Sequence, residues 1–207
     1  MLIAVDGPLA SGKGTIARAL AARFGLPHLD TGTLYRAVAV AVLDAGGDPH
    51  DAAAAEAAAR TLDMSRVDEA AIRTAGAGAA ASIVSAHEGV RAALKALQQD
   101  FARQPGGAVL DGRDIGTVIA PEADVKLFVT ASPQVRASRR WNELVGRGDA
   151  ITLEQVMSQL LERDGRDAGR AFAPLTKADD AIELDTSDLD ESEAIAAAIV
   201  IVEASTS

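Results

Sequence analysis

Short, continuously apolar runs alternate along the chain with longer stretches in which apolar residues recur at helical spacing. A run without polar alternation is typical of a strand covered on both faces, and the longer spacing is typical of an amphipathic helix. The expected strands are Leu2–Asp6, His28–Asp30, Ala108–Asp111, Val125–Thr130 and Ala181–Asp185. The expected helices are, approximately, Gly12–Phe24, Thr33–Ala45, Ala52–Leu62, Val90–Ala102, Pro133–Arg147, Thr152–Arg170 and Glu191–Ala204. This alternation predicts an α/β fold with a parallel, doubly wound sheet and a ligand site at the carboxyl ends of its strands.

The stretch between the second and third expected strands is too long for a simple crossover and is helical in character throughout. Val90, Leu94, Leu97 and Phe101, for example, recur at helical spacing and predict a core-facing stripe. We therefore expect a helical insertion near the ligand site. Its low-complexity segment Ala52–Ala59 predicts a plain surface helix, because alanine is the best helix former.

The loop after the first strand carries the most informative local signal. It reads Gly7-Pro8-Leu9-Ala10-Ser11-Gly12-Lys13-Gly14-Thr15 between an apolar strand and a helix. Such a turn is a phosphate cradle, because glycines let backbone N–H groups approach an anion and the lysine neutralises charge on the β- and γ-phosphates. An ordinary strand–helix turn, the alternative, would not need a lysine there. Gly14 stands where many GTPases and motor ATPases place a hydroxyl residue, with Thr15 one place later, and this variant indicates a small-molecule kinase.

Composition and charge exclude several classes of protein. The chain has 207 residues, of which 48% are hydrophobic and 24% charged, as in a soluble globular protein. A chain without cysteine forms no disulfides and suits a cytoplasmic enzyme. No apolar run is long enough for a membrane span, and the first strand begins at residue 2, so we expect neither a span nor a signal peptide. The net charge of −10 argues against a nucleic-acid partner.

Polar residues follow the expected strands at the edge where this architecture places its chemistry. Asp111 ends the third strand beside the phosphate loop, where a carboxylate could orient Mg²⁺ or its water shell, or could merely cap the strand. Arg113 and Asp114 follow directly, and they could either bind a ligand or form a mutual surface salt bridge. Asp30 and Thr31 follow the second strand in the same way, with Tyr35 and Arg36 on the next helix.

Arginine is concentrated between Arg136 and Arg170, which is unexpected in an acidic chain and suggests recognition of several phosphates. Arg163, Arg166 and Arg170 are spaced i, i+3 and i+7, so they are expected to share one helix face, with Asp167 beside them. Three arginines on one face repel one another unless an anion or carboxylates lie opposite. The alternative is a solvated face with acidic neighbours.

Four segments in chain order together resemble the bacterial cytidylate kinases. They are Gly7–Thr15, Leu29–Arg36, Asp111–Thr117 and Arg163–Arg170, and the likeness runs almost from end to end. It implies transfer of the γ-phosphoryl group of ATP to CMP or dCMP. It also implies the P-loop kinase fold, with a five-stranded parallel sheet flanked by helices, a helical monophosphate-binding insertion and a small lid. The expected single domain has its core at about 1–36, 104–142 and 171–207, its insertion at about 37–103 and its lid at about 143–170.

The same resemblance implies roles for residues at matching positions. The implied catalytic residues are Lys13, Arg113, Arg163 and Arg170. The implied ATP-binding residues are Gly7, Pro8, Leu9, Ala10, Ser11, Gly12, Lys13, Gly14 and Thr15. The implied CMP-binding residues are Ser82, Arg91 and Asp114 at the base, Thr31, Arg36 and Arg113 at the acceptor phosphate, and Arg163 and Asp167 at the ribose. Mg²⁺ bound with ATP is expected near Thr15 and, through water, near Asp111.

The chain departs from its relatives mainly in the insertion. Only Asp63–Ala71 remains where many family members carry a small antiparallel sheet, and Thr74–Ala79 has no acidic residue. Thr31 stands in place of a common serine and keeps its hydroxyl, whereas Gln99 stands in place of a common arginine.

Two other functions stay open from the sequence. Another small kinase, acting on shikimate, an adenylate or dephospho-coenzyme A, could share the phosphate loop, although the segments Asp111–Thr117 and Arg163–Arg170 count against it. Alternatively, a regulatory module could bind ATP only to gate a partner surface. For the favoured kinase we expect ATP and CMP or dCMP as ligands, no nucleic acid, no membrane, a monomer and a cytoplasmic location.

Overall fold

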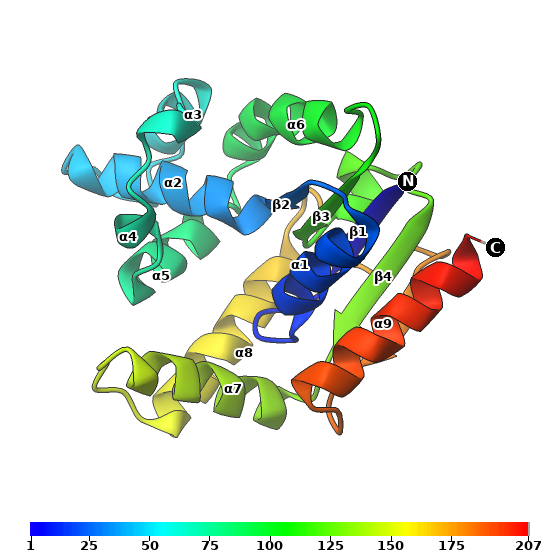
Figure 1. Cartoon of the computed structure of the whole chain (residues 1–207). Coiled ribbons are helices and arrows are strands. Elements are labelled where there is room, and N and C mark those ends of the chain that lie inside the picture. Colours follow the sequence, from blue (N-terminus) through cyan, green and yellow to red (C-terminus); the bar gives the residue numbers. More distant parts are fainter. Residues whose placement is uncertain (207) are drawn as a thin grey trace. The chain divides into compact units, whose positions relative to one another are not determined.

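The computed structural model describes residues 1–206, which form two compact units. Unit 1 joins Met1–Leu29 to the chain from Phe101 onward, and unit 2 is Asp30–Asp100. Figure 1 traces both along the sequence. Among the residues described, no helix has both the length and the apolar character that crossing a membrane requires.

A five-stranded sheet runs through unit 1. Its strands are β1 (Leu2–Asp6), β2 (His28–Asp30), β3 (Ala108–Gly112), β4 (Val125–Thr130) and β5 (Ile182–Asp185). They lie in the order β2-β3-β1-β4-β5, and the pairs of β1 with β3, β1 with β4 and β4 with β5 are parallel. The chain leaves β1 toward one edge and later returns to its other side at β4, so the carboxyl end of β1 is a topological switch point.

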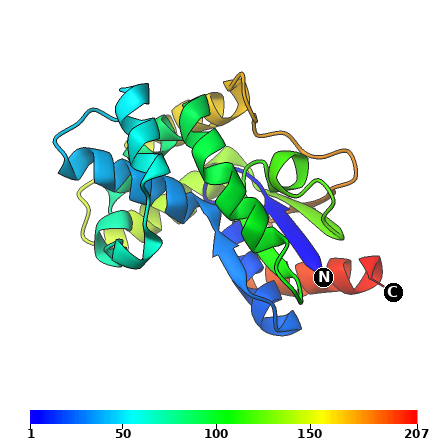
Figure 2. The ribbon, with the colours of Figure 1, turned by 90° about the horizontal axis from the view of Figure 1, so that it is seen from above.

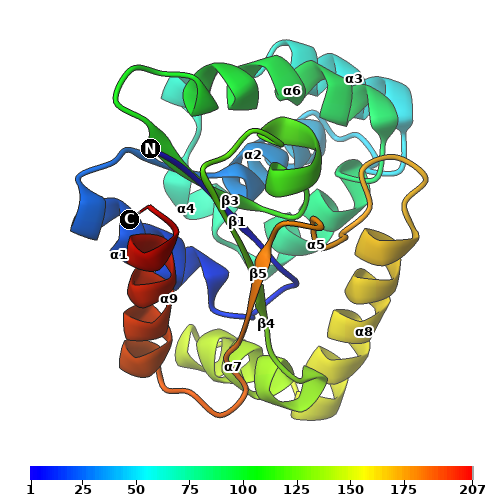
Figure 3. The same ribbon diagram turned by 90° about the vertical axis from the view of Figure 1, so that its right-hand side faces the viewer.

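Branched apolar residues of the central strands form the core of unit 1. Ile3, Val5, Leu127 and Val129 are almost fully buried. One face of the sheet is covered by α1 (Lys13–Phe24) and α9 (Glu191–Ser205), which lie side by side in Figures 1 and 3. The start of β1 and the end of α9 lie on the same side of unit 1, as Figure 2 also shows.

The segment after β3 opens with an irregular turn and continues into a helical pair. The π-helical turn η2 (Ile115–Ile119) packs its apolar side against β1 and β3. After β4, α7 (Pro133–Gly146) and α8 (Leu153–Gly169) pack together around Leu144, Val156 and Leu160. The Trp141 indole N–H donates to the Ile151 carbonyl at 3.0 Å and holds the connection between the two helices.

Unit 2 is helical and is built largely from small residues. Its elements are α2 (Thr31–Asp44), α3 (Ala52–Arg60), η1 (Met64–Arg66), α4 (Glu69–Ile72), α5 (Ala75–Val84) and most of α6 (Glu88–Ala102). Ala39, Ala55 and Ala81 belong to its core, where their short side chains let neighbouring helices approach closely. The alanine-rich helix α3 is a surface helix, as the sequence predicted, and it buries Ala55 and Ala59 on the face toward this core.

The expected fold class is confirmed, and the differences are local. All five strands were predicted within one residue of their bounds, because continuous apolar runs are a strong strand signal. The helix α5 was not predicted, since Gly76 and Gly78 lower helix propensity. It is held by burial and by the Thr74 cap, whose hydroxyl accepts from the Ala77 N–H at 3.1 Å. The shortened segment of the insertion holds η1 and α4.

Candidate active site

The phosphate loop follows β1 at the switch point and turns into α1. A Cβ on Gly7 would lie 2.0 Å from the Val129 carbonyl oxygen, so only glycine fits there. Gly12 has φ +93° and Ala10 has φ +60°, and the alanine therefore adopts a left-handed conformation that costs energy for any residue with a Cβ. Neighbouring contacts must hold this strained path in place.

Three carbonyl groups of the loop accept hydrogen bonds from side chains. The Pro8 oxygen accepts from Lys13 Nζ at 3.3 Å, and the Leu9 oxygen accepts from Arg136 Nη1 at 3.2 Å. The Ser11 oxygen accepts from the Thr186 hydroxyl at 3.0 Å. In a trans peptide the N–H points away from the C=O, so fixing each carbonyl also fixes the N–H of the following residue. The loop is thus preorganised as a set of amide donors, which is the property that an anion site needs.

Asp111 stands at the end of β3 beside the phosphate loop. His28 Nε2 lies 2.7 Å from Asp111 Oδ2, and Asp111 Oδ1 lies 3.8 Å from where a Cβ on Gly14 would be. The residues described contain no group of three or more potential metal-ligating side chains. One carboxylate and the hydroxyl of Thr15 nevertheless fit Mg²⁺, which keeps several waters and takes further oxygens from substrate phosphates.

Asp6 holds the turn that follows β3. It is buried and accepts hydrogen bonds from the backbone N–H groups of Ile115 at 2.9 Å and Gly116 at 2.7 Å. Burial raises the pKa of Asp6 from 3.8 to about 6, although these two hydrogen bonds act in the opposite direction. Asp6 thereby anchors the segment that carries Arg113 and Asp114.

Three arginines surround the buried carboxylate of Asp167. Arg113 Nε donates to Asp167 Oδ2 at 2.9 Å, and Arg163 Nε lies 4.0 Å from the same oxygen. Arg170 Nε donates to the backbone carbonyl of Asp167 at 3.3 Å. Burial alone would raise the pKa of Asp167, but the charges of the three guanidinium groups outweigh it and hold the pKa below its ordinary value. We call Arg113, Arg163, Asp167 and Arg170 the Asp167 cluster.

The arginine face predicted on α8 is only partly present. Arg163 and Arg170 turn toward Asp167, whereas Arg166 pairs with the exposed Glu162 at 2.9 Å. Arg166 therefore fits the alternative prediction, a solvated helix face with acidic neighbours. Arg113 donates one hydrogen bond to the Asp167 carboxylate and another to the backbone carbonyl of Gly112, the residue before it.

Much of the arginine concentration serves contacts within the protein. Arg136 pairs with Asp164, and Arg140 and Arg147 pair with Glu143. Recognition of several phosphates therefore does not account for the whole concentration, because these guanidinium groups already have carboxylate partners.

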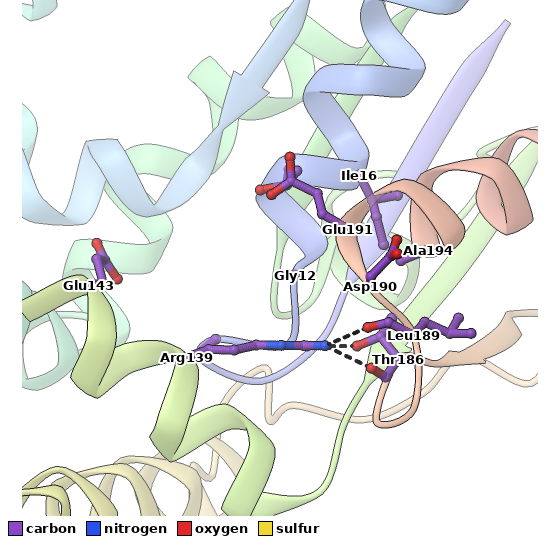
Figure 4. Close-up of a pocket in the computed structure, with 11 residues that line it drawn as sticks. Gly12, Ile16, Arg139, Glu143, Thr186, Leu189, Asp190, Glu191 and Ala194 are labelled. Atoms are coloured by element: carbon purple, nitrogen blue, oxygen red, sulfur yellow. Dashed lines mark hydrogen bonds between the residues drawn. The ribbon is translucent and has the colours of Figure 1, made fainter. Parts of the chain in front are cut away.

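A cavity of about 480 Å³ lies beside the phosphate loop, between α1, α7 and the start of α9. Arg139 extends from α7 across it and donates to the Thr186 hydroxyl at 2.9 Å and to the carbonyls of Thr186 and Leu189 at 2.8 and 3.3 Å (Figure 4). Gly12 and Thr15 of the loop line the same cavity. The planar guanidinium of Arg139 is therefore immobilised next to the phosphate loop.

Unit 2 contains the remaining predicted residues. Thr31 and Ser82 are buried, and Arg36 is half-buried on α2. Arg91 is buried on α6, where its guanidinium carbon lies 5.4 Å from the centre of the Tyr35 ring and its Nη1 donates to the Ser85 carbonyl at 3.2 Å. These contacts fix the direction of the Arg91 side chain.

Sequence reasoning did not assign five residues that shape the site in unit 1. They are Asp6, His28, Arg136, Arg139 and Thr186. Arg136 and Arg139 lie in the arginine-rich segment, and Asp6 directly precedes the loop, so a local signal existed for these three. Thr186 and His28 acquire their partners only through the tertiary fold.

The parallel sheet and the loop at its switch point define a phosphate-loop nucleotide-binding protein. The family model described as cytidylate kinase matches residues 3–204. The cytidylate kinase of Xanthobacter autotrophicus is 63% identical over 204 residues, covering 99% of this chain and 98% of that protein. The cytidylate kinase of Caulobacter vibrioides is 58% identical over 202 residues, covering 98% and 95%. The chain therefore belongs to the cytidylate kinase family, as its motifs predicted.

A solved structure shares the fold. An uncharacterized protein from Eubacterium ventriosum matches with a TM-score of 0.54 at 12% sequence identity, covering 100% of this chain and 98% of that one. At this identity the likeness concerns the fold alone.

Proposed function

We propose that this protein transfers the γ-phosphoryl group of ATP to CMP or dCMP, giving ADP and CDP or dCDP. The observation that carries this proposal is the match to cytidylate kinases over nearly the full length of both chains. A preorganised phosphate loop and a cluster of arginines in the same unit supply the two kinds of anion site that such a reaction needs.

ATP is the donor, and residues Gly7–Thr15 bind its phosphates. Lys13 supplies a positive charge and the loop amides supply hydrogen bonds, both aimed at oxygens that gain charge as the phosphoryl group moves. The cavity bounded by Arg139 and Leu189 is the site that we propose for the nucleoside of ATP. An immobilised guanidinium can stack on a flat base, and Arg139 is held in its plane by three hydrogen bonds.

CMP is the acceptor. From unit 1 we propose Arg113, Asp114, Arg163 and Asp167 as its ligands, and from unit 2 Thr31, Arg36, Ser82 and Arg91. Cytosine presents an exocyclic amino donor and two acceptors, so a carboxylate can accept a hydrogen bond from its edge and an arginine can donate to it. Asp114 and Arg91 are both buried, so a base that fails to hydrogen-bond to either side chain should bind less tightly.

The chemistry asks little of the protein beyond positioning and charge. The acceptor is already a phosphate anion, so no strong general base is required. Arg163 and Arg170 stabilise charge on the transferring group, and a closed lid excludes water, which would otherwise act as the acceptor. We propose that residues at about 143–170 form this lid.

Mg²⁺ bound with ATP would be held by the Thr15 hydroxyl and, through water, by Asp111. When bound, it would neutralise negative charge on the donor phosphates. The contact with His28 at 2.7 Å fixes the direction of the Asp111 carboxylate. We further propose a monomeric cytoplasmic enzyme without a nucleic-acid partner, which fits the net charge of −10 and the absence of cysteine.

An acceptor panel tests the proposal. Purified protein is incubated with labelled ATP and, separately, CMP, dCMP, UMP, AMP, shikimate and dephospho-coenzyme A. We expect rapid transfer to CMP or dCMP. Preferred transfer to shikimate, AMP or dephospho-coenzyme A would favour the other kinases, and ATP binding without turnover on any acceptor would favour a regulatory module.

The variant Asp114→Asn tests the proposed base recognition. It should lower kcat/KM for CMP by roughly 10- to 150-fold, the worth of one charged hydrogen bond, and leave ATP affinity nearly unchanged. Asp179→Asn, an exposed change before β5 and outside the proposed lid, is the matched control. An equal loss of ATP affinity in Asp114→Asn would assign this residue to the donor side.

A further inference from the structure

Arg136 is a buried arginine whose hydrogen bonds join three separate segments of unit 1. Its Nε donates to the Ala131 carbonyl at 2.9 Å, and its Nη1 donates to the Leu9 carbonyl at 3.2 Å. Nη1 and Nη2 also donate to the two oxygens of Asp164, at 3.1 and 2.6 Å. One guanidinium thus connects the end of β4, the phosphate loop and α8.

The two ends of this connection have different roles. Leu9 belongs to the phosphate loop, and its carbonyl is part of the peptide plane that leads into Ala10, the residue with φ +60°. Asp164 lies on α8 next to Arg163 and three residues before Asp167, so it moves with the helix that carries these two members of the Asp167 cluster. The two are linked through a single nitrogen, because Nη1 contacts both Leu9 and Asp164.

The geometry of arginine makes this link stiff. A guanidinium is planar, and its donors leave in fixed directions. The bidentate pair with Asp164 fixes the plane of the Arg136 guanidinium. The bond from Nε to the Ala131 carbonyl fixes the end of the group nearest the side-chain stem. A displacement of Asp164 therefore tilts Nη1 and weakens its bond to Leu9, which releases the Leu9–Ala10 peptide plane and the Ala10 N–H on its other side.

We propose that Arg136 is a positioning residue that couples α8 to the phosphate loop, so that the placement of the arginine-bearing helix sets the orientation of a loop amide that binds the donor phosphates. Its kinetic consequences rest on the proposed kinase function, whereas its effect on ATP binding and on the loop does not. Arg136 touches no substrate in this scheme and acts through Leu9.

Asp164→Asn is the sharpest variant, because Asp164 bonds to Arg136, which in turn bonds to the loop at Leu9. The amide keeps the volume but loses the charge and one acceptor. We expect the Kd of a non-hydrolysable ATP analogue to rise about 10-fold, the lower end for losing a charged hydrogen bond, with faster hydrogen exchange in the peptide covering residues 7–15. The KM for ATP should rise similarly, with a much smaller change in the KM for CMP.

A double-mutant cycle separates coupling from simple packing of α7 on α8. Arg136→Lys keeps a charge but cannot reach Leu9 and both oxygens of Asp164 together, so it should match or exceed the loss in Asp164→Asn. The double variant should be no worse than Arg136→Lys alone. Asp164→Glu keeps the carboxylate and should restore part of the ATP affinity. Additive losses, or unchanged analogue affinity and loop exchange in Asp164→Asn, would overturn the proposal.

The exposed pair of Arg23 and Glu203 provides the matched control. It also joins two helices of unit 1, at 2.8 Å, and it lies outside the site. Arg23→Lys and Glu203→Gln should leave analogue affinity and loop exchange unchanged. If the unaltered protein phosphorylates no CMP, the proposed function fails while analogue binding and exchange still decide the coupling. If it phosphorylates CMP but Asp164→Asn binds the analogue normally, only the coupling fails.

Discussion

The phosphate loop and the Asp167 cluster, both in unit 1, prepare for anions in different ways. The loop uses neutral groups, because its carbonyls accept hydrogen bonds from Lys13, Arg136 and Thr186 and its amides are thereby oriented in advance. The cluster uses charge, because the guanidinium groups of Arg113, Arg163 and Arg170 surround the Asp167 carboxylate and lower its pKa. A hydrogen-bonded cradle is complete without its ligand, whereas several like charges held close together gain further stability from a bound anion.

Variants of the loop and variants of the cluster should therefore affect different properties of the protein. A loop already in its final geometry stabilises charge without reorganisation, so removing its cation should affect the transferring phosphoryl group directly. The cluster changes its electrostatic energy when substrate enters. Variants there should affect stability and the ligand-bound state together.

The largest expected effect is that of Lys13→Ala. The variant removes the loop's cation, and kcat should fall at least ~10²-fold, the scale for losing one preorganised charge-stabilising donor. Steady-state kinetics with saturating ATP and CMP measure it. Lys177→Ala, which removes an exposed lysine paired with Glu183, is the control. A near-normal kcat in Lys13→Ala would contradict the proposal that this loop binds the phosphates of ATP during transfer.

Arg170→Ala tests whether the cluster acts in the transition state. Arg170 is buried against the Asp167 backbone, and its removal should lower kcat by roughly 10- to 150-fold with little rise in either KM. Arg166→Ala, four residues earlier in the chain and paired with Glu162, should have a much smaller effect. Equal effects of the two changes would mean that the orientation of Arg170 toward Asp167 has no catalytic consequence.

Asp167→Asn tests how much the carboxylate stabilises the cluster. The variant removes the negative charge that attracts Arg113 and Arg163, and the free energy of unfolding at pH 7 should fall by about 2 kcal/mol, less than for a fully buried pair because both arginines are partly exposed. Because the pKa of Asp167 is held below 3.8, this contribution is present above that pH and is lost as the pH falls further. Urea unfolding measures it, and full stability in the variant would show that the Asp167 carboxylate makes no net contribution to stability.

Asp6 should give the smallest effect, with the opposite sign. Its pKa is raised from 3.8 to about 6, so the folded protein binds this proton more tightly than the unfolded chain. Stability from this group is therefore present at low pH and is lost as the pH rises through 6. Between pH 7.5 and 5 it should add about 1.4 kcal/mol to the unfolding free energy, a gain that Asp6→Asn lacks. Parallel pH profiles of the two proteins would contradict the raised pKa.

The sequence predicted the local parts of the site well. The phosphate loop, the strand ends at Asp111 and the motif containing Arg113 and Asp114 are contiguous signals, and the family assignment that rested on them is confirmed. The roles of the individual site residues stay predictions. Helical spacing alone placed three arginines on one face, but it could not tell which would turn toward Asp167 and which toward Glu162. That choice depends on which neighbours each side chain meets.

The five strands, the phosphate loop and the family could be predicted from the chain alone, because each depends on residues close together in the sequence. What holds the loop open to an anion depends instead on the tertiary fold. Leu9 meets Arg136 and Ser11 meets Thr186 across 127 and 175 residues, respectively. No local pattern encodes such a pairing, because it exists only when β1, β4 and β5 lie side by side in the sheet and bring the ends of their strands together.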